Sequence, residues 1–476
     1  MNVNCVSRFI SIACIIGCII FFAAFGTTSL ADTEFAFITT TDFSSGSASV
    51  IWLDGSYTVE KNVVSLHSDA VARYYDGLIY AVNRLGADNI HVLDPNNNFA
   101  TVLQFSVGNG SNPSDIAFVS KTKAYVSRYD STHIWVVNPS TGAKIGSIDL
   151  SSLADADGLP EMDRLCIFEK HLFITIQRLD RNNYWVPVGT SYIAVVDVDA
   201  DTLVDTDPVT PGKQSIPLAG TNPFSDLKIN PYKGTLYVSC VGYWGIQDCG
   251  IEMVDPGAFH TLGYTLTEAS SGGDINDMEI VAPDKGYAII TNASFHNILI
   301  SFDQETGIVT DTLYAPGDYV LHDIEKAPTG ELFLADGTLT NPGVRVYDIA
   351  TNMQVLPGPI DVGLLPFDIT FSVNIPSGMA INPPFVASMG QNFPNPFNPS
   401  TTIPFTLAKE ITVKLSIYDV TGRHVRTILN ERRPAGDHLV HWDGRDEASR
   451  ILPSGVYFAR LEADDFIATR KLLLLK

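Results

Sequence analysis

The chain has 476 residues, which exceeds one ordinary domain and fits two or three. Its 53 acidic and 30 basic residues give a net charge of −23, and this excludes nucleic acid as the main partner, because phosphate binding needs a basic surface. The 45% of hydrophobic residues excludes a largely disordered chain, and the 36 Gly and 27 Pro favour many turns and β structure.

The first 31 residues have the pattern of a secretory signal. Arg8 supplies a positive start, residues 9–25 form an apolar run, and Ser29-Leu30-Ala31 places small residues before a cleavage site. Two alternatives stay open: an uncleaved membrane anchor, because the run is almost long enough to span a bilayer, and a lipoprotein signal in which Cys18 is lipidated. In each case we expect export through the inner membrane.

Three cysteines follow the signal. Cys240 and Cys249 lie nine residues apart around glycine and aromatic residues, so they predict a disulfide within a hairpin loop in an oxidising compartment. Cys166 lies in an apolar strand pattern, where a buried small hydrophobe is expected. No cysteine spacing indicates a zinc site.

One pattern recurs between residues 32 and 372. An Asp opens a short strand, an aromatic residue follows in the next strand, and a third strand ends in Asp or Asn. The opening residues are Asp69, Asp115, Asp163, Asp226, Asp277, Asp323 and Asp368. The aromatic residues are Phe37, Tyr80, Tyr125, Phe173, Tyr237, Tyr287 and Phe333. The third-strand terminators are Asp54, Asp94, Asn138, Asp197, Asp255, Asp303 and Asp348. The steps of 43, 45, 48, 64, 50 and 46 residues between the aromatic residues are typical of propeller blades with four strands.

The two ends of this pattern predict how the ring closes. The chain enters at a second-strand position, residues 35–39, and the last unit stops at an opening strand, residues 366–371. We therefore expect the last strand to complete the first blade, which leaves no open sheet edge at the seam.

The repeats KAYVSRYDSTHIWVVNPSTGAKIGSIDL (residues 123–150) and GTLYVSC…GIEMVDP (residues 234–256) resemble the YncE-like, YVTN-type seven-bladed propellers. The resemblance implies a fold and leaves the activity open, because this fold carries many unrelated functions. We predict an all-β chain: a seven-bladed β-propeller over residues 32–372 and a small C-terminal Ig-like β-sandwich over residues 391–476.

The repeated carboxylates have two interpretations. An Asp at the end of a strand can cap a turn by accepting backbone N–H bonds, and this explains why every blade has one. Alternatively, a ring of carboxylates at the channel mouth could hold a divalent ion such as calcium, with Asp163, Asp226 and Asp277 as ligands. We expect the structural role and therefore no cofactor.

The composition changes near the C-terminus. Residues 373–390 are rich in Pro and uncharged, which indicates a linker. Residues 391–476 carry 12 basic and 10 acidic residues, whereas residues 32–390 carry 17 basic and 43 acidic, so the acidity belongs to the propeller. Alternating apolar runs separated by turns predict a small antiparallel sandwich over residues 391–476.

This module resembles the type A C-terminal sorting domain of the type IX secretion system, which is similar to the Ig-like domain of flagellar hook-capping proteins. The motifs are QNFPNPFNPSTTI (391–403), IYDVTGR (417–423), AGDHLVHWDGRD (435–446), SGVYFARL (454–461) and TRKLLLLK (469–476). The resemblance implies that the outer-membrane type IX machinery reads residues 391–476 and delivers the chain to the outer surface, or the surroundings, of a Gram-negative-type bacterium. A plain binding sandwich is the alternative role.

Blades four and five have long loops between their second and third strands. Each loop carries a Tyr-Trp pair, and both emerge on the face where the inner strands begin. One interpretation is a ligand platform beside the channel mouth, since aromatic faces suit sugar rings and cations. The alternative is that the aromatic residues pack the two loops together. The aromatic residues are Tyr184, Trp185, Tyr243 and Trp244, and the polar contacts are Asn182, Asn183, Gln247 and Asp248.

The sequence leaves open a structural spacer in a larger surface assembly, and it is compatible with two further functions. The first is a non-catalytic, exported propeller that binds a glycan, a peptide or a neighbouring surface protein. The second is a lactonase-like hydrolase or a lyase that uses channel-mouth carboxylates and a divalent ion, which requires unlike catalytic groups at one spot. We expect the first, because a regular Asp in every blade is not such a spot and no catalytic motif has a supporting context.

Overall fold

The computed structural model describes residues 34–212, 214–372, 387–389, 392, 394–407, 410–420, 422–434, 436–448, 450–463 and 466–475. These residues are almost entirely β, with one short α-helix, α1 (Glu268–Ser271), and 3-10 turns at Pro95–Asn97 and Ser151–Leu153. No helix among them is long and apolar enough to span a membrane. The predicted signal lies outside the described residues, and so does the predicted linker except for residues 387–389.

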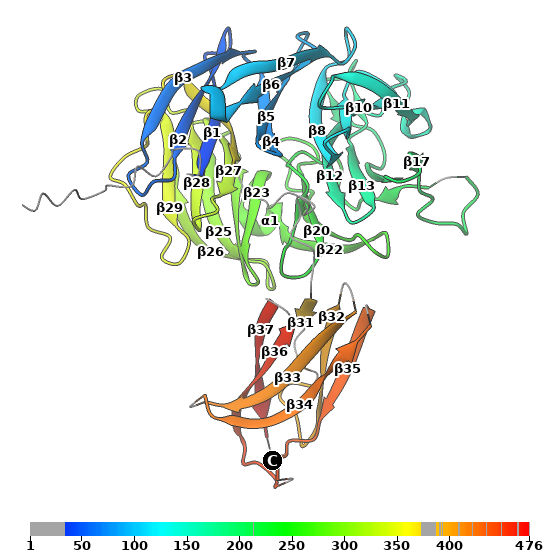
Figure 1. Ribbon diagram of the computed structural model, residues 1–476, viewed down its shortest axis with the longest axis vertical. Helices are drawn as coiled ribbons and strands as arrows, with labels where there is room; N and C mark the ends of the chain where they lie inside the picture. Colours follow the sequence, from blue (N-terminus) through cyan, green and yellow to red (C-terminus); the bar gives the residue numbers. More distant parts are fainter. Residues whose placement is uncertain are drawn as a thin grey trace, which may run out of the picture. The chain divides into compact units, whose positions relative to one another are not determined.

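Described residues between 34 and 372 form seven antiparallel blades that follow one another in chain order around a ring (Figure 1). Blade one contains β1 (Phe35–Thr41), β2 (Gly46–Trp52), β3 (Val59–Leu66) and β30 (Leu365–Phe371). Blade two contains β4 (Ala70–Tyr75), β5 (Leu78–Asn83), β6 (Asn89–Asp94) and β7 (Ala100–Ser106). Blade three contains β8 (Pro113–Ser120), β9 (Lys123–Arg128), β10 (His133–Asn138) and β11 (Ala143–Asp149).

Blade four contains β12 (Met162–Phe168), β13 (His171–Ile176), β16 (Tyr192–Asp197), β17 (Thr202–Leu203) and β18 (Ile216–Pro217), with a small hairpin of β14 (Leu179–Asp180) and β15 (Val186–Pro187) in its loop. Blade five contains β19 (Lys228–Ile229), β20 (Leu236–Cys240), β21 (Gly250–Asp255) and β22 (His260–Thr267). Blade six contains β23 (Asp274–Ala282), β24 (Lys285–Thr291), β25 (Asn297–Asp303) and β26 (Ile308–Tyr314). Blade seven contains β27 (Leu321–Lys326), β28 (Glu331–Asp336) and β29 (Gly343–Asp348).

The ring closes as the sequence predicts. β30 pairs antiparallel with β1, and Ile369 lies opposite Ile38 in the register. Ser372 extends the pairing, because the Phe35 N–H donates to its Oγ (2.7 Å) and the Ser372 N–H donates to the Phe35 carbonyl (2.8 Å). The first and last strands of the ring therefore share one sheet, and neither leaves an open edge at the seam.

The repeated landmarks have the predicted local roles. The seven second-strand aromatic residues are buried, and they fill the spaces between neighbouring sheets. The seven third-strand terminators accept backbone N–H bonds in the following turn; Asp197, for example, accepts from Asp199 and Ala200 (2.9 and 2.8 Å). A short side-chain acceptor at a strand end satisfies turn amides that lack a ladder partner.

The C-terminal residues form a separate two-sheet sandwich. One sheet contains β31 (Ala387–Met389), β32 (Thr401–Leu407) and β35 (Gly436–Trp442). The other contains β34 (His424–Arg433), β33 (Ile411–Asp419), β36 (Gly455–Ala463) and β37 (Phe466–Leu474). Trp442, Phe397 and Phe405 lie in the core between the sheets. β31 belongs to this sandwich although its residues fall within the range predicted as linker.

Candidate functional site

Two parts of the propeller concentrate chemistry-bearing side chains. The first is the channel, which is lined by the inner strand of each blade: β30, β4, β8, β12, β19, β23 and β27. The second is the loop face, defined here as the loops that join the second and third strands of the blades together with the segments that lead into the inner strands. The loops are residues 42–45, 84–88, 129–132, 177–191, 241–249, 292–296 and 337–342.

Four of the opening Asp residues link neighbouring blades. The Oδ2 atom of each accepts a backbone N–H from the next inner strand along the chain, or from β4 after the last one. The pairs are Asp115 with Leu165 (3.0 Å), Asp277 with Ile324 (3.0 Å), Asp323 with Ile369 (2.7 Å) and Asp368 with Ala72 (2.8 Å). We call these contacts the Asp–amide links. These links give the Asp residues the structural role that the repeat predicts. In each link, the Asp of one blade accepts an N–H bond from the neighbouring blade.

The other three opening Asp residues have side-chain partners. Asp69 pairs with Arg84 (2.6 Å), and Asp163 accepts from Gln177 Nε2 (3.3 Å). Asp226 pairs with two guanidinium groups, those of Arg73 (3.1 Å) and Arg164 (3.3 Å).

Arg73 crosses the channel. Its guanidinium contacts Asp115 of blade three (2.9 Å), Asp226 of blade five (3.1 Å) and Asp368 of blade one (3.6 Å), although Arg73 itself belongs to blade two. Burial opposes the charge of Arg73, but these three carboxylates raise its pKa well above the ordinary value. One side chain thus ties four blades together across the channel.

Lys228 forms a second buried cluster. Its Nζ pairs with Glu279 of blade six (3.1 Å) and with Glu325 of blade seven. Burial opposes the charge of Lys228, while both glutamates raise its pKa well above the ordinary value. The carboxyl groups here outnumber the cations: burial raises the pKa of Asp277 to about 6, and it raises the pKa of Asp323 well above its usual range.

The three Asp residues considered as metal ligands do not converge on an empty centre. Arg164 lies between Asp163 (3.7 Å) and Asp226 (3.3 Å), and both carboxylate oxygens of Asp277 accept backbone N–H bonds. Among the described residues, no group of three or more His, Cys, Asp or Glu side chains has the placement of a metal site. Sequence reasoning missed Arg73, Arg164 and Lys228; the available signal was a basic residue in the inner strands β4, β12 and β19.

The aromatic pairs of blades four and five lie on the loop face as expected. Tyr184 is 94% exposed, Trp185 is 47% exposed and Trp244 is 40% exposed. Trp185 lies 6.3 Å from the Tyr129 ring, and Trp244 lies 5.3 Å from the Phe224 ring, so each Trp packs on its own neighbour. The Tyr243 hydroxyl reaches the Pro187 carbonyl (3.4 Å) and links the two loops.

Arg181 supports the blade-four pair. Its guanidinium lies 4.9 Å from the Trp185 ring centre and 5.4 Å from that of Tyr129, in cation–π geometry. It also pairs with the buried Glu161 (2.9 Å). Part of the Trp185 ring therefore packs against Arg181 and Tyr129, as the loop-packing interpretation predicts. The rest of the residue remains exposed to solvent.

Exposed apolar side chains extend beyond these two blades. Phe43, Leu85, Phe295 and Leu339 stand exposed in the corresponding loops of blades one, two, six and seven. Five loop-face residues, Phe43, Leu85, Tyr184, Trp185 and Phe295, also have left-handed backbone with φ between 44° and 65°. Large side chains seldom adopt this conformation, and each costs on the order of 1 kcal/mol relative to glycine. The sequence contains these residues, but no residue pattern indicated that their side chains lie on the loop face together.

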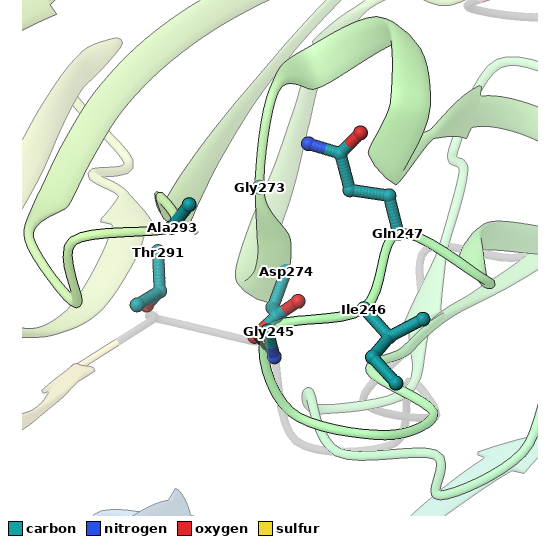
Figure 2. Close-up of a pocket in the computed structure, with 7 residues that line it drawn as sticks. All are labelled: Gly245, Ile246, Gln247, Gly273, Asp274, Thr291 and Ala293. Atoms are coloured by element: carbon teal, nitrogen blue, oxygen red, sulfur yellow. Dashed lines mark hydrogen bonds between the residues drawn. The ribbon is translucent and has the colours of Figure 1, made fainter.

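A pocket of about 350 Å³ opens on the loop face at the boundary of blades five and six (Figure 2). It is lined by Gly245, Ile246, Gln247, Gly273, Asp274, Thr291 and Ala293. Gln247 is one of the predicted polar contacts. Asn183 and Asp248 are exposed on the two long loops, and Gly242 accommodates Asp248: a Cβ at Gly242 would lie 2.0 Å from Asp248 Oδ1.

Cys240 and Cys249 are free, buried thiols in the structure, so the disulfide predicted from their spacing is not formed in it. The Cys249 Sγ instead accepts the Thr221 N–H (3.4 Å). Burial raises the pKa of the Cys249 thiol to about 12, which favours the neutral form. Cys166 is a third free thiol.

Comparison with protein families matches residues 398–465 to the FlgD Ig-like domain, in agreement with the two-sheet sandwich of the C-terminal residues. No match was found among curated proteins. The chain is therefore an all-β protein with a seven-bladed propeller and a C-terminal Ig-like sandwich.

Solved structures similar to the chain include β-propellers. A protein from Lactobacillus plantarum is 11% identical with a TM-score of 0.52, over 72% of this chain and all of that one. PorZ, a surface component of the type IX secretion system of Porphyromonas gingivalis, is 14% identical with a TM-score of 0.43; the match covers 91% of this chain but only 64% of PorZ. A putative 6-phosphogluconolactonase from Bacteroides fragilis is 15% identical with a TM-score of 0.45, over 72% of this chain and 99% of that one. At these identities the likeness concerns the fold alone.

The channel cluster leads to a stability prediction. Lys228→Met should lower the free energy of unfolding by about 3 kcal/mol, the lower end of the range for a buried pair, because it leaves Glu279 and the partly exposed Glu325 without their cation. We expect the thermal midpoint of the full chain to fall by about 5 °C or more. The matched control is Lys61→Met, which removes an exposed pair with Asp361 and should change stability by less than about 1 kcal/mol. Equal midpoints for the two variants would contradict the structural importance of the Lys228 cluster.

Proposed function

We propose that this protein is an exported propeller that binds a ligand or partner through its loop face, and that its C-terminal module directs it through the type IX secretion system. The observation that carries the binding proposal is the set of exposed apolar side chains in the loops of six blades, all on one face.

The exposed apolar residues of the loop face lower the stability of the folded protein in two ways. Apolar side chains that stand in water forgo the stabilisation that burial brings, about 25 cal/mol per Å² of apolar surface. Five of the loop-face residues also hold left-handed backbone, which glycine or asparagine adopts at less cost. Exposed apolar side chains gathered on one face of a folded protein are typical of an interaction site.

The chemistry of the face favours a glycan or a protein segment over an anion. Trp185, Tyr184 and Tyr243 offer ring faces, and Asn183 and Asp248 offer amide and carboxylate groups beside them. Such combinations suit sugar rings and amphipathic side chains. The net charge of −26 over residues 32–390 disfavours nucleic acid.

The enzymatic alternative, a hydrolase or lyase in the channel, has less support. Most of the carboxylates that would hold a divalent ion already accept backbone N–H bonds or pair with Arg73, Arg164 or Lys228. Arg73 also crosses the channel and contacts three of these carboxylates.

The delivery proposal rests on the C-terminal residues. The ordered set of motifs from residue 391 to residue 476 resembles the type A sorting domain, and the FlgD Ig-like match falls within the same range. The N-terminal apolar segment supplies the first step of that route, export through the inner membrane. The proposed location is the outer cell surface or the surrounding medium.

Binding is tested by thermal unfolding of the full chain across soluble glycans, calcium and a chelator. A ligand at a hundred times its Kd adds about 2.7 kcal/mol, which corresponds to a rise of several degrees in the midpoint. We expect a glycan to give this shift and the double variant Tyr184→Ala, Trp185→Ala to lose it.

The matched control for this experiment is Val102→Ala, Ile145→Ala, which trims two comparably exposed side chains of the outer strands β7 and β11. It should keep the shift. A shift that survives in the loop-face variant would contradict the proposed platform, and a shift with calcium alone would favour the channel alternative.

Delivery is tested in a host that has the type IX machinery. The full chain should reach the surface or medium, whereas a chain ending at residue 390 should stay in the periplasm, because the sorting module is missing. The Tyr184→Ala, Trp185→Ala variant controls for folding and should be delivered normally. Equal delivery of the chain ending at residue 390 would overturn the sorting role.

A further inference from the structure

The pocket between blades five and six contains a buried carboxylate that is only half satisfied. Asp274 is 1% exposed, and its Oδ2 accepts the Gly245 N–H (2.7 Å). Its Oδ1 is buried and has no hydrogen-bond partner among the described residues. Figure 2 shows the Asp274 carboxylate between the segment from Gly245 to Gln247 and the strand end that carries Thr291. A buried polar atom without a partner destabilises the folded protein, so a hydrogen-bond donor that enters the pocket relieves this cost.

The surroundings of Asp274 are negative. Asp248 and Glu268 lie near it, and burial together with Asp248 raises the pKa of Asp274, while burial raises the pKa of Glu268 to about 8. None of the ion pairs found in the described part of the chain involves Asp248, Glu268 or Asp274. This distinguishes the pocket from the channel, where each carboxylate cluster has an arginine or lysine.

The remaining walls suit an organic cation. Ile246 supplies apolar surface, and a Cβ built on Gly245 would lie 3.9 Å from the Phe295 ring, so an exposed aromatic flanks the Gly245 side of the pocket. Gln247 also lines the pocket, and its side chain extends away from the Asp274 carboxylate (Figure 2). Calcium prefers six to eight oxygen ligands, whereas an alkylammonium needs two or three acceptors and apolar contacts for its chain.

We propose that this pocket binds a primary alkylammonium group, with Asp274 Oδ1 as the charge partner. The inference rests on the proposed binding function of the loop face and names the ligand chemistry for one part of it. A lysine side chain of a partner protein and a free amine share this chemistry. The volume of about 350 Å³ is at the lower end of ligand pockets, which fits one such group rather than a large ligand.

Calorimetric titration of the full chain with N-acetyl-lysine amide at neutral pH tests the proposal. We expect saturable binding, and no binding of N-acetyl-norleucine amide, which keeps the alkyl chain and lacks the ammonium. Butylamine distinguishes the sources: binding equal to that of the lysine derivative indicates a free amine, and weaker binding indicates a peptide.

The deciding variant is Asp274→Asn, which keeps the acceptor for the Gly245 N–H and removes the charge. It should weaken binding by at least about tenfold. Asp284→Asn removes an equal charge from the exposed turn between β23 and β24, outside the loop face, and should leave the affinity within about twofold. Gln247→Leu provides a second test on an exposed side chain, with a smaller expected loss.

Three results would overturn the proposal: no binding of either amine, equal binding of the norleucine derivative, or unchanged affinity in Asp274→Asn. A glycan-dependent thermal shift that requires Tyr184 and Trp185 would survive such a result, so the loop-face function can stand when the ammonium pocket fails. Conversely, amine binding that depends on Asp274 without any glycan shift would support the pocket and leave the aromatic platform unsupported.

Discussion

The Asp–amide links are the interaction on which the rest of the propeller depends. Each places a carboxylate of one inner strand against a backbone N–H of the next, so neighbouring blades are held at fixed spacing close to the axis. Carboxylates buried in this way need compensation, because an isolated buried charge is strongly unfavourable. Arg73, Arg164 and Lys228 provide it, and Arg73 does so by reaching three other blades.

The paired charges of the channel limit where a ligand could bind. The guanidinium of Arg73 occupies the channel, and the channel carboxylates have internal partners. The open polar and aromatic groups lie instead on the loop face, where Tyr184, Trp185 and the Asp274 pocket are found. The propeller thus combines a centre of internally paired charges with an exposed aromatic surface built from loops.

Much of the architecture follows from local pattern. The aromatic residue of each second strand and the Asp or Asn at each third-strand end recur in every blade, and each has a local physical role that a single repeat unit reveals. The position of Phe35 near the start and Pro366 near the end likewise indicated which strands share the first blade. These features are determined by residues that lie close together in the sequence.

The functional features depend on residues far apart in the sequence. Asp226 lies 153 positions from Arg73, so no sequence window contains both. Asp274 lies three residues before the repeated Asp277 and is not itself a repeated position, so the repeat gave no reason to select it. The left-handed backbone of Phe43, Leu85 and Phe295 is set by loop closure and has no residue-type signal, since glycine or asparagine would be expected there.

Hydrogen–deuterium exchange of the full chain, read by mass spectrometry on overlapping peptides, tests the account most directly. If the Asp–amide links hold the blades, peptides that span Leu165, Ile324 and Ile369 should exchange as slowly as the most protected strands. In Asp277→Ala the peptide with Ile324 should lose protection more than the peptide with Ile369, because Ile369 keeps its link to Asp323. Fast exchange of these inner-strand peptides in the unaltered protein, or equal effects of Asp277→Ala on both, would contradict the central role of the links.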